Sequence, residues 1–166
     1  MENKFIIAIY VDNTSGVLSR VTSMFTRRGF NIDTLTVGET ECPEYSRITI
    51  SLSGDASARQ QLISQLTKLY NVKKVEYISD EQGVKRELLL IKVRNSTKNR
   101  QDILAAVDIF RAKIIDYSDE ALCIEVTGDS SKIDAFIDNM KKYEIIEICR
   151  TGIVALERGA TSILNS

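Results

Sequence analysis

The sequence contains no histidine, and this absence removes most of the common catalytic arrangements. Ser-His-Asp and Cys-His catalysis both need an imidazole as the base, and most zinc chemistry in proteins uses histidine ligands. Catalysis by carboxylate, lysine or tyrosine side chains remains open on composition alone.

The sequence also has few cysteines, a net charge close to zero and no long apolar run. The three cysteines, Cys42, Cys123 and Cys149, form no close pair, which suits a reducing cytosol better than a disulfide framework. The net charge is −1 and no block of lysine and arginine stands out, which weighs against nucleic acid. The longest apolar run, Phe5–Val11, is far too short to cross a bilayer, and the N-terminus has no signal-peptide pattern. We expect a cytoplasmic protein, with no membrane partner and with Cys123 and Cys149 buried.

The remaining composition is that of a soluble globular protein. Apolar residues make up 43% and charged residues 27% of a chain of 166 residues. This length is sufficient for one ordinary domain or for two small ones.

The first half of the chain alternates strand and helix patterns. Phe5–Val11 is apolar without alternation, as in a strand buried on both faces, and Gly16–Arg28 carries one apolar stripe at helical spacing. Asn13, Thr14 and Ser15 are each suitable to cap this helix. The further expected elements are strands at Asn31–Gly38, Tyr45–Ser53 and Val72–Ile78, and a helix that Asp55 caps.

The same pattern starts again after the polar segment Ser79–Gly83, which we interpret as a linker. Gly54-Asp55 and Gly128-Asp129 precede the second helix of each half, which supports an internal repeat. The further expected elements are a helix that Thr97 caps and strands at Lys85–Val93, Ala112–Asp116, Ala121–Thr127 and Glu144–Leu156, the last one with Gly152 as the point where it can break. We therefore predict an α+β fold of two tandem ferredoxin-like βαββαβ units, residues 1–79 and 84–159, with a tail at 160–166.

The turn after the first strand is the best candidate for a binding site. It joins the apolar run to the first helix through small polar residues and Gly16. The free N–H groups at the start of a helix, beside such a loop, bind anions such as a carboxylate. Asn13 and Asn31 can each offer an oxygen to the ammonium of an amino acid and an amide donor to its carboxylate.

Several longer motifs make the interpretation specific. The loop Asp12–Leu18 resembles the ligand loop of ACT domains, which are small βαββαβ modules that sense amino acids. The whole chain from about residue 4 to residue 159 is similar to the small subunit of acetolactate synthase. The motifs that carry this resemblance are Leu18–Val21, Arg27–Gly38, Ser46–Ile50, Phe110–Asp116 and Arg150–Gly159.

The resemblance implies a regulatory subunit without an active site. The expected partner is a separate large catalytic subunit, which uses thiamine diphosphate, a divalent metal and FAD in a transferase holoenzyme of branched-chain amino acid biosynthesis. This chain would hold none of these cofactors. It would activate the large subunit and confer feedback inhibition by valine or a related amino acid.

The resemblance also carries over an effector site. Asn13, Gly16 and Asn31 match the family's effector-binding positions, and the site lies between two subunits of a homodimer. The expected apolar wall consists of Val17, Leu18 and Ile32. Each polar residue also has a plain structural interpretation, as a helix cap or a turn residue. The corresponding loop of the second half, 94–98, lacks the Gly-x-Leu turn, so we expect no equivalent site there.

A physical argument that does not depend on the resemblance also favours the expected homodimer. In a ferredoxin-like sheet, the strand Asn31–Gly38 lies at an edge, and it contains no proline or lysine to discourage pairing. Pairing with its symmetry mate would cover this edge.

Three other functions fit the same fold class. An acylphosphatase-like hydrolase would need an arginine in a phosphate-binding loop, where this chain has Asp12 and Asn13. An RNA-binding module would present aromatic side chains on its central strands, where Ile48 and Ile50 stand. A stand-alone amino-acid sensor that acts on another partner is the alternative nearest to the regulatory subunit.

Overall fold

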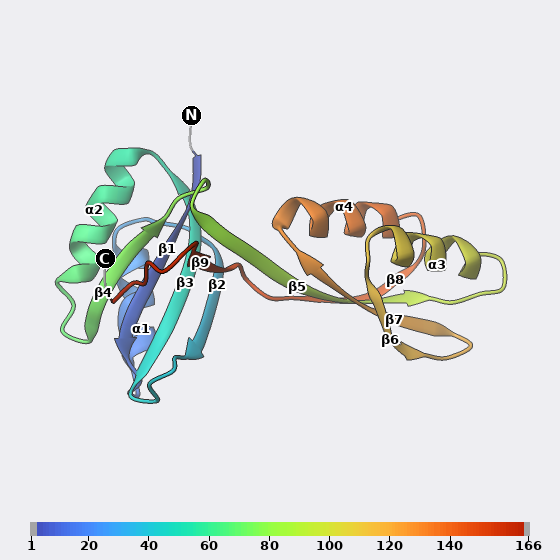
Figure 1. Ribbon diagram of the computed structural model, residues 1–166, viewed down its shortest axis with the longest axis horizontal. Helices are drawn as coiled ribbons and strands as arrows, with labels where there is room; N and C mark the ends of the chain where they lie inside the picture. The colour runs from blue at the N-terminus through green and yellow to red at the C-terminus, as the bar shows by residue number, and fades with distance from the viewer. Residues whose placement is uncertain (1–2, 165–166) are drawn as a thin grey trace. The chain divides into compact units, whose positions relative to one another are not determined.

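The computed structural model describes residues 3–164 (Figure 1) and has the predicted α+β fold. The chain divides into two compact units. One unit contains the residues up to 84 together with those from 152 onward, and the other contains residues 85–151. Each unit has an antiparallel sheet and two helices, so the predicted pair of βαββαβ units is confirmed.

The first unit packs two helices on one face of a four-stranded sheet, whose strand order is β2-β3-β1-β4. Side chains at alternate positions of β1, such as Ile7 and Ile9, are fully buried against the helices. Phe25 of α1 and Leu66 of α2 close this core. The elements are β1 (Asn3–Asp12), α1 (Val17–Arg27), β2 (Ile32–Glu39), β3 (Tyr45–Gly54), α2 (Ala56–Thr67) and β4 (Val72–Ile78).

The opposite face of this sheet is covered by residues 152–164, which we call the return segment. It includes β9 (Val154–Glu157), and its side chains Ala155 and Ile163 are buried against Ile6 and Tyr10 of β1. The Arg47 side chain of β3 donates a hydrogen bond of 2.8 Å to the Ala155 carbonyl oxygen. In Figure 1 the red segment crosses the strands of this unit.

This packing differs from the expected domain division. The sequence suggests that residues 84–159 form one unit and that 160–166 form a tail. The structure instead groups the whole return segment with the first unit, because its apolar side chains fill the second face of that sheet.

The second unit repeats the arrangement with the strand order β6-β7-β5-β8, and β9 also pairs with β5. Its core contains Phe136 of α4, which meets Phe110 edge to face at 5.2 Å between ring centroids. The elements are β5 (Gly83–Arg94), α3 (Arg100–Ile109), β6 (Lys113–Tyr117), β7 (Ala121–Gly128), α4 (Ser130–Met140) and β8 (Ile145–Arg150).

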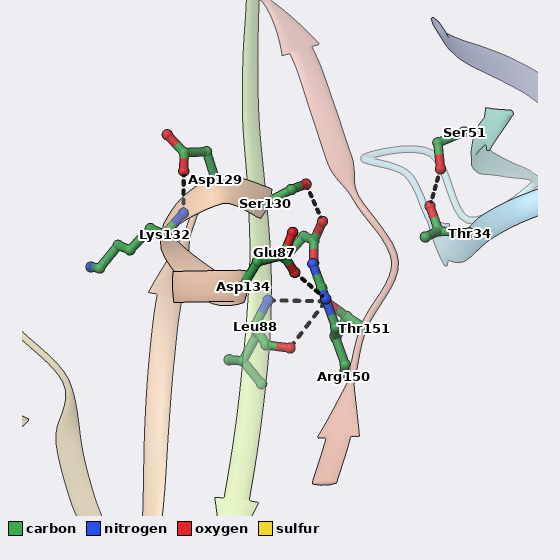
Figure 2. Close-up of polar contacts among 10 residues, drawn as sticks. All are labelled: Thr34, Ser51, Glu87, Leu88, Asp129, Ser130, Lys132, Asp134, Arg150 and Thr151. Atoms are coloured by element: carbon green, nitrogen blue, oxygen red, sulfur yellow. Dashed lines mark hydrogen bonds and ion pairs between the residues drawn. The ribbon is translucent and has the colours of Figure 1, made fainter. Parts of the chain in front are cut away.

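A buried ion pair joins the strands and the helix of the second unit (Figure 2). The Glu87 side chain of β5 is only 2% exposed, and its carboxylate accepts hydrogen bonds from Arg150 Nε and from the Ser130 hydroxyl. Arg150 also donates to the carboxylate of Asp134 at 2.7 Å. These bonds raise the pKa of the Arg150 guanidinium, with the bond to Glu87 as the largest cause.

The helix caps agree with the sequence where a carboxylate precedes the helix. The side chains of Asp55 and Asp129 accept bonds from the N–H groups of Ala58 and Lys132, which confirms the predicted cap at Asp55. The other two cap predictions are wrong. Gly16 rather than Asn13, Thr14 or Ser15 caps α1, and Asn99 rather than Thr97 caps α3.

Other details of the sequence interpretation also change. The expected linker is a tight turn that the Gly83 N–H closes on the Ser79 carbonyl oxygen, and β5 begins at once. Cys149 is exposed and Cys123 is half-buried, so the expectation that both are buried is wrong. Within residues 3–164, no helix is long and apolar enough to cross a membrane.

Replacing Gly152 with alanine is expected to destabilise the first unit. An added Cβ would lie 2.5 Å from Thr36 Oγ1 and 3.1 Å from the backbone nitrogen of Leu35 in β2. Backbone cannot give way as a flexible side chain does, so we expect a loss of about 1–3 kcal/mol in the free energy of unfolding. Urea denaturation measures it.

The control for this prediction is the double variant. Thr36→Ala in the Gly152→Ala background removes the nearest atom and should restore part of the loss. A Gly152→Ala variant as stable as the parent would show that the return segment does not lie this close to β2.

Candidate functional site

The candidate loop begins at Asp12, which is held by two neighbours from β4 and the turn before it. Its carboxylate lies 3.1 Å from Lys73 Nζ and accepts a hydrogen bond of 3.1 Å from the Asn71 side chain. These two bonds lower the pKa of the Asp12 carboxyl, and the bond from Lys73 is the larger cause. Its backbone N–H also donates to the Asn71 carbonyl oxygen. The start of the loop is therefore fixed in place.

Asn13 is held just as firmly by the β2–β3 turn. Its backbone N–H donates to the Glu44 carbonyl oxygen at 2.7 Å. Its side-chain Nδ2 donates to Glu39 Oε1 at 3.1 Å and to the Pro43 carbonyl oxygen at 2.9 Å. No donor from the described residues bonds to Asn13 Oδ1. The side chain is exposed, so this carbonyl oxygen is available to a ligand.

Gly16 has a backbone conformation that favours glycine. Its φ is +83°, and it precedes α1 without any side-chain cap. Nothing lies within 4 Å of the position that a Cβ would occupy. Because the first N–H groups of a helix have no intrahelical partner, this open side of the loop can accept an anion.

The expected apolar wall is only partly at the surface. The Val17 side chain is buried in the helix-face core, and Ile32 packs against the same core. Leu18 is 40% exposed and thus presents an apolar side chain beside the loop. Val37 of β2 is 42% exposed and was missed by the sequence analysis. The sequence could have indicated Val37, because it is an apolar residue in an edge strand, near the end that leads to the Pro43 turn.

Asn31 lies at the other end of the sheet. Ile32 is in register with Leu52 and through it with Phe5, at the start of β1, whereas the loop follows Asp12 at its end. This part of β1 spans about 23 Å at the usual rise of a strand. Within one chain, the structure therefore brings Asn13 and Gly16 together but keeps Asn31 apart from them.

Comparisons with known proteins identify the family to which this chain belongs. A family model described as AHAS small subunit-like ACT domain matches residues 7–74, and one described as small subunit of acetolactate synthase matches residues 86–159. A protein of Archaeoglobus fulgidus named as a probable acetolactate synthase small subunit is 49% identical, over 94% of this chain and 98% of its own. This chain belongs to the acetolactate synthase small-subunit family.

Two further members of the acetolactate synthase small-subunit family support the assignment. The acetolactate synthase small subunit of Mycobacterium bovis is 43% identical, over 95% of this chain and 94% of its own. The crystal structure of the Thermotoga maritima small subunit covers 96% of this chain and 99% of its own, with a TM-score of 0.90 and 43% identity. The resemblance stated from the motifs is thus confirmed, and the family includes the ACT domain that carries the candidate loop.

Proposed function

We propose that this chain activates a thiamine-diphosphate-dependent catalytic subunit and confers feedback inhibition by valine or a related amino acid. The observation that carries the proposal is the loop of the ACT domain. It combines the N–H groups at the start of α1 with Asn13 Oδ1, which accepts no hydrogen bond from residues 3–164, and these suit a carboxylate and an ammonium. A regulatory role is what small-subunit membership supports.

The site would be completed by a second copy of the chain. β2 is an edge strand of its sheet, and isologous pairing about a two-fold axis normal to the sheet is antiparallel. Glu39, which bonds Asn13, ends β2, and Asn31 directly precedes its start. Antiparallel pairing would thus bring Asn31 of the partner subunit to the Asn13 loop, although the two residues lie at opposite ends of the sheet within one chain.

Each part of a branched-chain amino acid then has a partner. The N–H groups at Gly16 and Leu18 would bind the carboxylate, together with the Val17 N–H once it leaves its long bond of 3.4 Å to the Thr14 carbonyl oxygen. The oxygens of Asn13 and of the partner's Asn31 would bind the ammonium. The exposed side chains of Leu18 and Val37, with Ile32 of the partner subunit, would supply an apolar wall. The chain itself would have no catalytic role. Thiamine diphosphate, the divalent metal and FAD would belong to the catalytic subunit, in the cytoplasm.

Titration calorimetry of the full chain with valine, leucine and isoleucine tests the proposal. We expect saturable binding of at least one of the three amino acids, and inhibition of the reconstituted holoenzyme by the same one. If none of them binds the chain alone, the titration is repeated with the catalytic subunit present. Absence of binding in both experiments would contradict the amino-acid site.

Replacing Val37 with lysine is expected to weaken the homodimer. The side chain is 42% exposed in the edge strand, so the change should leave the monomer folded while placing a charge in the proposed interface. Light scattering at micromolar concentration should show a dimer for the parent chain and a shift toward monomer for the variant. Tyr70→Lys, at a side chain that is 86% exposed outside β2, is the matched control. A monomeric parent chain would contradict the proposed interface.

A further inference from the structure

The orientation of the Asn13 side chain is set by the chain and not left to the ligand. Both of its side-chain hydrogen bonds run through Nδ2, one to the Glu39 carboxylate and one to the Pro43 carbonyl oxygen. An amide turned the other way would oppose its carbonyl oxygen to these two acceptors. Asn13 can therefore meet a ligand only with Oδ1, which accepts hydrogen bonds and cannot donate them.

We propose that Glu39 makes this site select α-amino acids over the 2-oxo acids of the same carbon skeleton. The inference rests on the proposed function and names the residue that would give it chemical selectivity. Glu39 acts first as a positioning residue, because it holds the Asn13 amide with its oxygen toward the ligand. It also supplies a negative charge next to that oxygen.

The charge of Glu39 is not neutralised by a neighbouring cation. Its Oε1 accepts from Asn13, and no lysine or arginine of the described residues forms an ion pair with it. The nearby cations act on other carboxylates, since Lys73 pairs with Asp12 and the Arg47 guanidinium interacts with Glu76 and Glu41. Glu44 in the same turn adds further negative charge, whereas the charge of Glu41 is offset by the Arg47 guanidinium. This side of the loop is thus electronegative, opposite in character to the N–H groups at Gly16.

The two ends of the site therefore match the two charges of an amino acid. A 2-oxo acid keeps the carboxylate but replaces the ammonium with a carbonyl oxygen, which would face Asn13 Oδ1 and the Glu39 carboxylate. Two hydrogen-bond acceptors that face each other repel. A polar site therefore rejects a ligand analogue without the hydrogen-bond donor far more strongly than an apolar pocket rejects an analogue that is shorter by one methylene. We expect the affinity for the amino acid to exceed that for its 2-oxo analogue by a factor of about 100 or more. Such a site responds to an amino acid even when the corresponding oxo acid is abundant.

Glu39→Gln is the test, with Glu41→Gln as the matched control. Both changes remove one negative charge from the same turn, but only Glu39 contacts Asn13. Titration calorimetry of the full chain uses the branched-chain amino acid bound by the parent and the 2-oxo acid with the same side chain. We expect Glu39→Gln to weaken amino-acid binding about tenfold and to lower the selectivity ratio by the same factor. Glu41→Gln should leave the ratio unchanged.

The outcomes separate this inference from the proposed function. If the parent binds the amino acid but Glu39→Gln keeps the parental ratio, or Glu41→Gln lowers it equally, the role of Glu39 is overturned and the amino-acid site stands. If the parent binds the 2-oxo acid as tightly as the amino acid, the selectivity is overturned. If no branched-chain amino acid binds with or without the catalytic subunit, the proposed function fails and this inference fails with it. Unchanged thermal unfolding of both variants shows that any change in the ratio is not a loss of fold.

Discussion

Replacing Gly16 with aspartate is expected to abolish effector binding, with a loss of affinity of about 100-fold or more. Two physical effects add. The φ of +83° at Gly16 disfavours residues with a Cβ, aspartate less than most, so the variant loop tends to relax away from the conformation that binds. The introduced carboxylate would also lie at the N-terminus of α1, where it would compete with the carboxylate of the effector for the same N–H groups. Calorimetric titration with the amino acid that the parent binds measures the loss.

The matched control is Gly159→Asp. Gly159 also has a positive φ, +77°, with nothing within 4 Å of an added Cβ, but it lies in the return segment. It should show similar backbone strain and unchanged effector binding. We also expect the Gly16→Asp holoenzyme to lose feedback inhibition while it keeps most of its activation by the small subunit. A Gly16→Asp variant with normal sensitivity would place the effector elsewhere.

Asn31→His, at the residue before the start of β2, should also abolish effector binding and feedback inhibition. Asn31 is exposed, and no hydrogen bond within residues 3–164 involves its side chain, so the substitution should not unfold the chain. A mixture of the two variant chains gives a sharper test. Because each site would take its loop from one chain and Asn31 from the other, heterodimers of Gly16→Asp and Asn31→His chains would contain one intact site. Restored partial binding in the mixture would therefore indicate a shared site, and no restoration would contradict it.

Much of the fold could be predicted because its signals are local. Alternation and helical spacing mark each element, and Asp55 and Asp129 cap their helices through bonds to residues three positions later. The cap of α1 could not be predicted in this way, because Gly16 acts through its backbone conformation and carries no side chain. The burial of Ile163 was also not predictable, since it depends on contacts with Ile6 and Tyr10, which lie far away in the sequence.

The candidate site shows the same division between local and distant signals. Asn13 and Gly16 lie within one motif, so their proximity could be predicted from it. The contact between Asn13 and Glu39 joins residues 26 positions apart, and it exists only because β1 and β2 both flank β3 in one particular register. Val17 and Leu18 are adjacent apolar residues in the sequence, and only the rotation of α1 decides that the first is buried and the second exposed.

The largest expected effect on stability is that of Arg150→Met in the second unit. The Glu87 carboxylate would keep only the Ser130 hydroxyl as a partner while its side chain remains 2% exposed. A buried carboxylate without its cation is strongly destabilising. Because the Arg150 side chain is still 32% exposed, we expect about 2–3 kcal/mol, below the range for fully buried pairs.

Urea denaturation of a double-mutant cycle tests this expectation. Glu87→Leu combined with Arg150→Met should recover most of the stability that Arg150→Met loses, since no buried charge remains. Arg94→Met is the control, because Arg94 pairs with Glu144 at 3.0 Å where both side chains are largely exposed, and it should change little. If Arg150→Met and Arg94→Met were equally mild, water would have to reach Glu87. The pair would then orient β5, β8 and α4 without contributing to the stability of the unit.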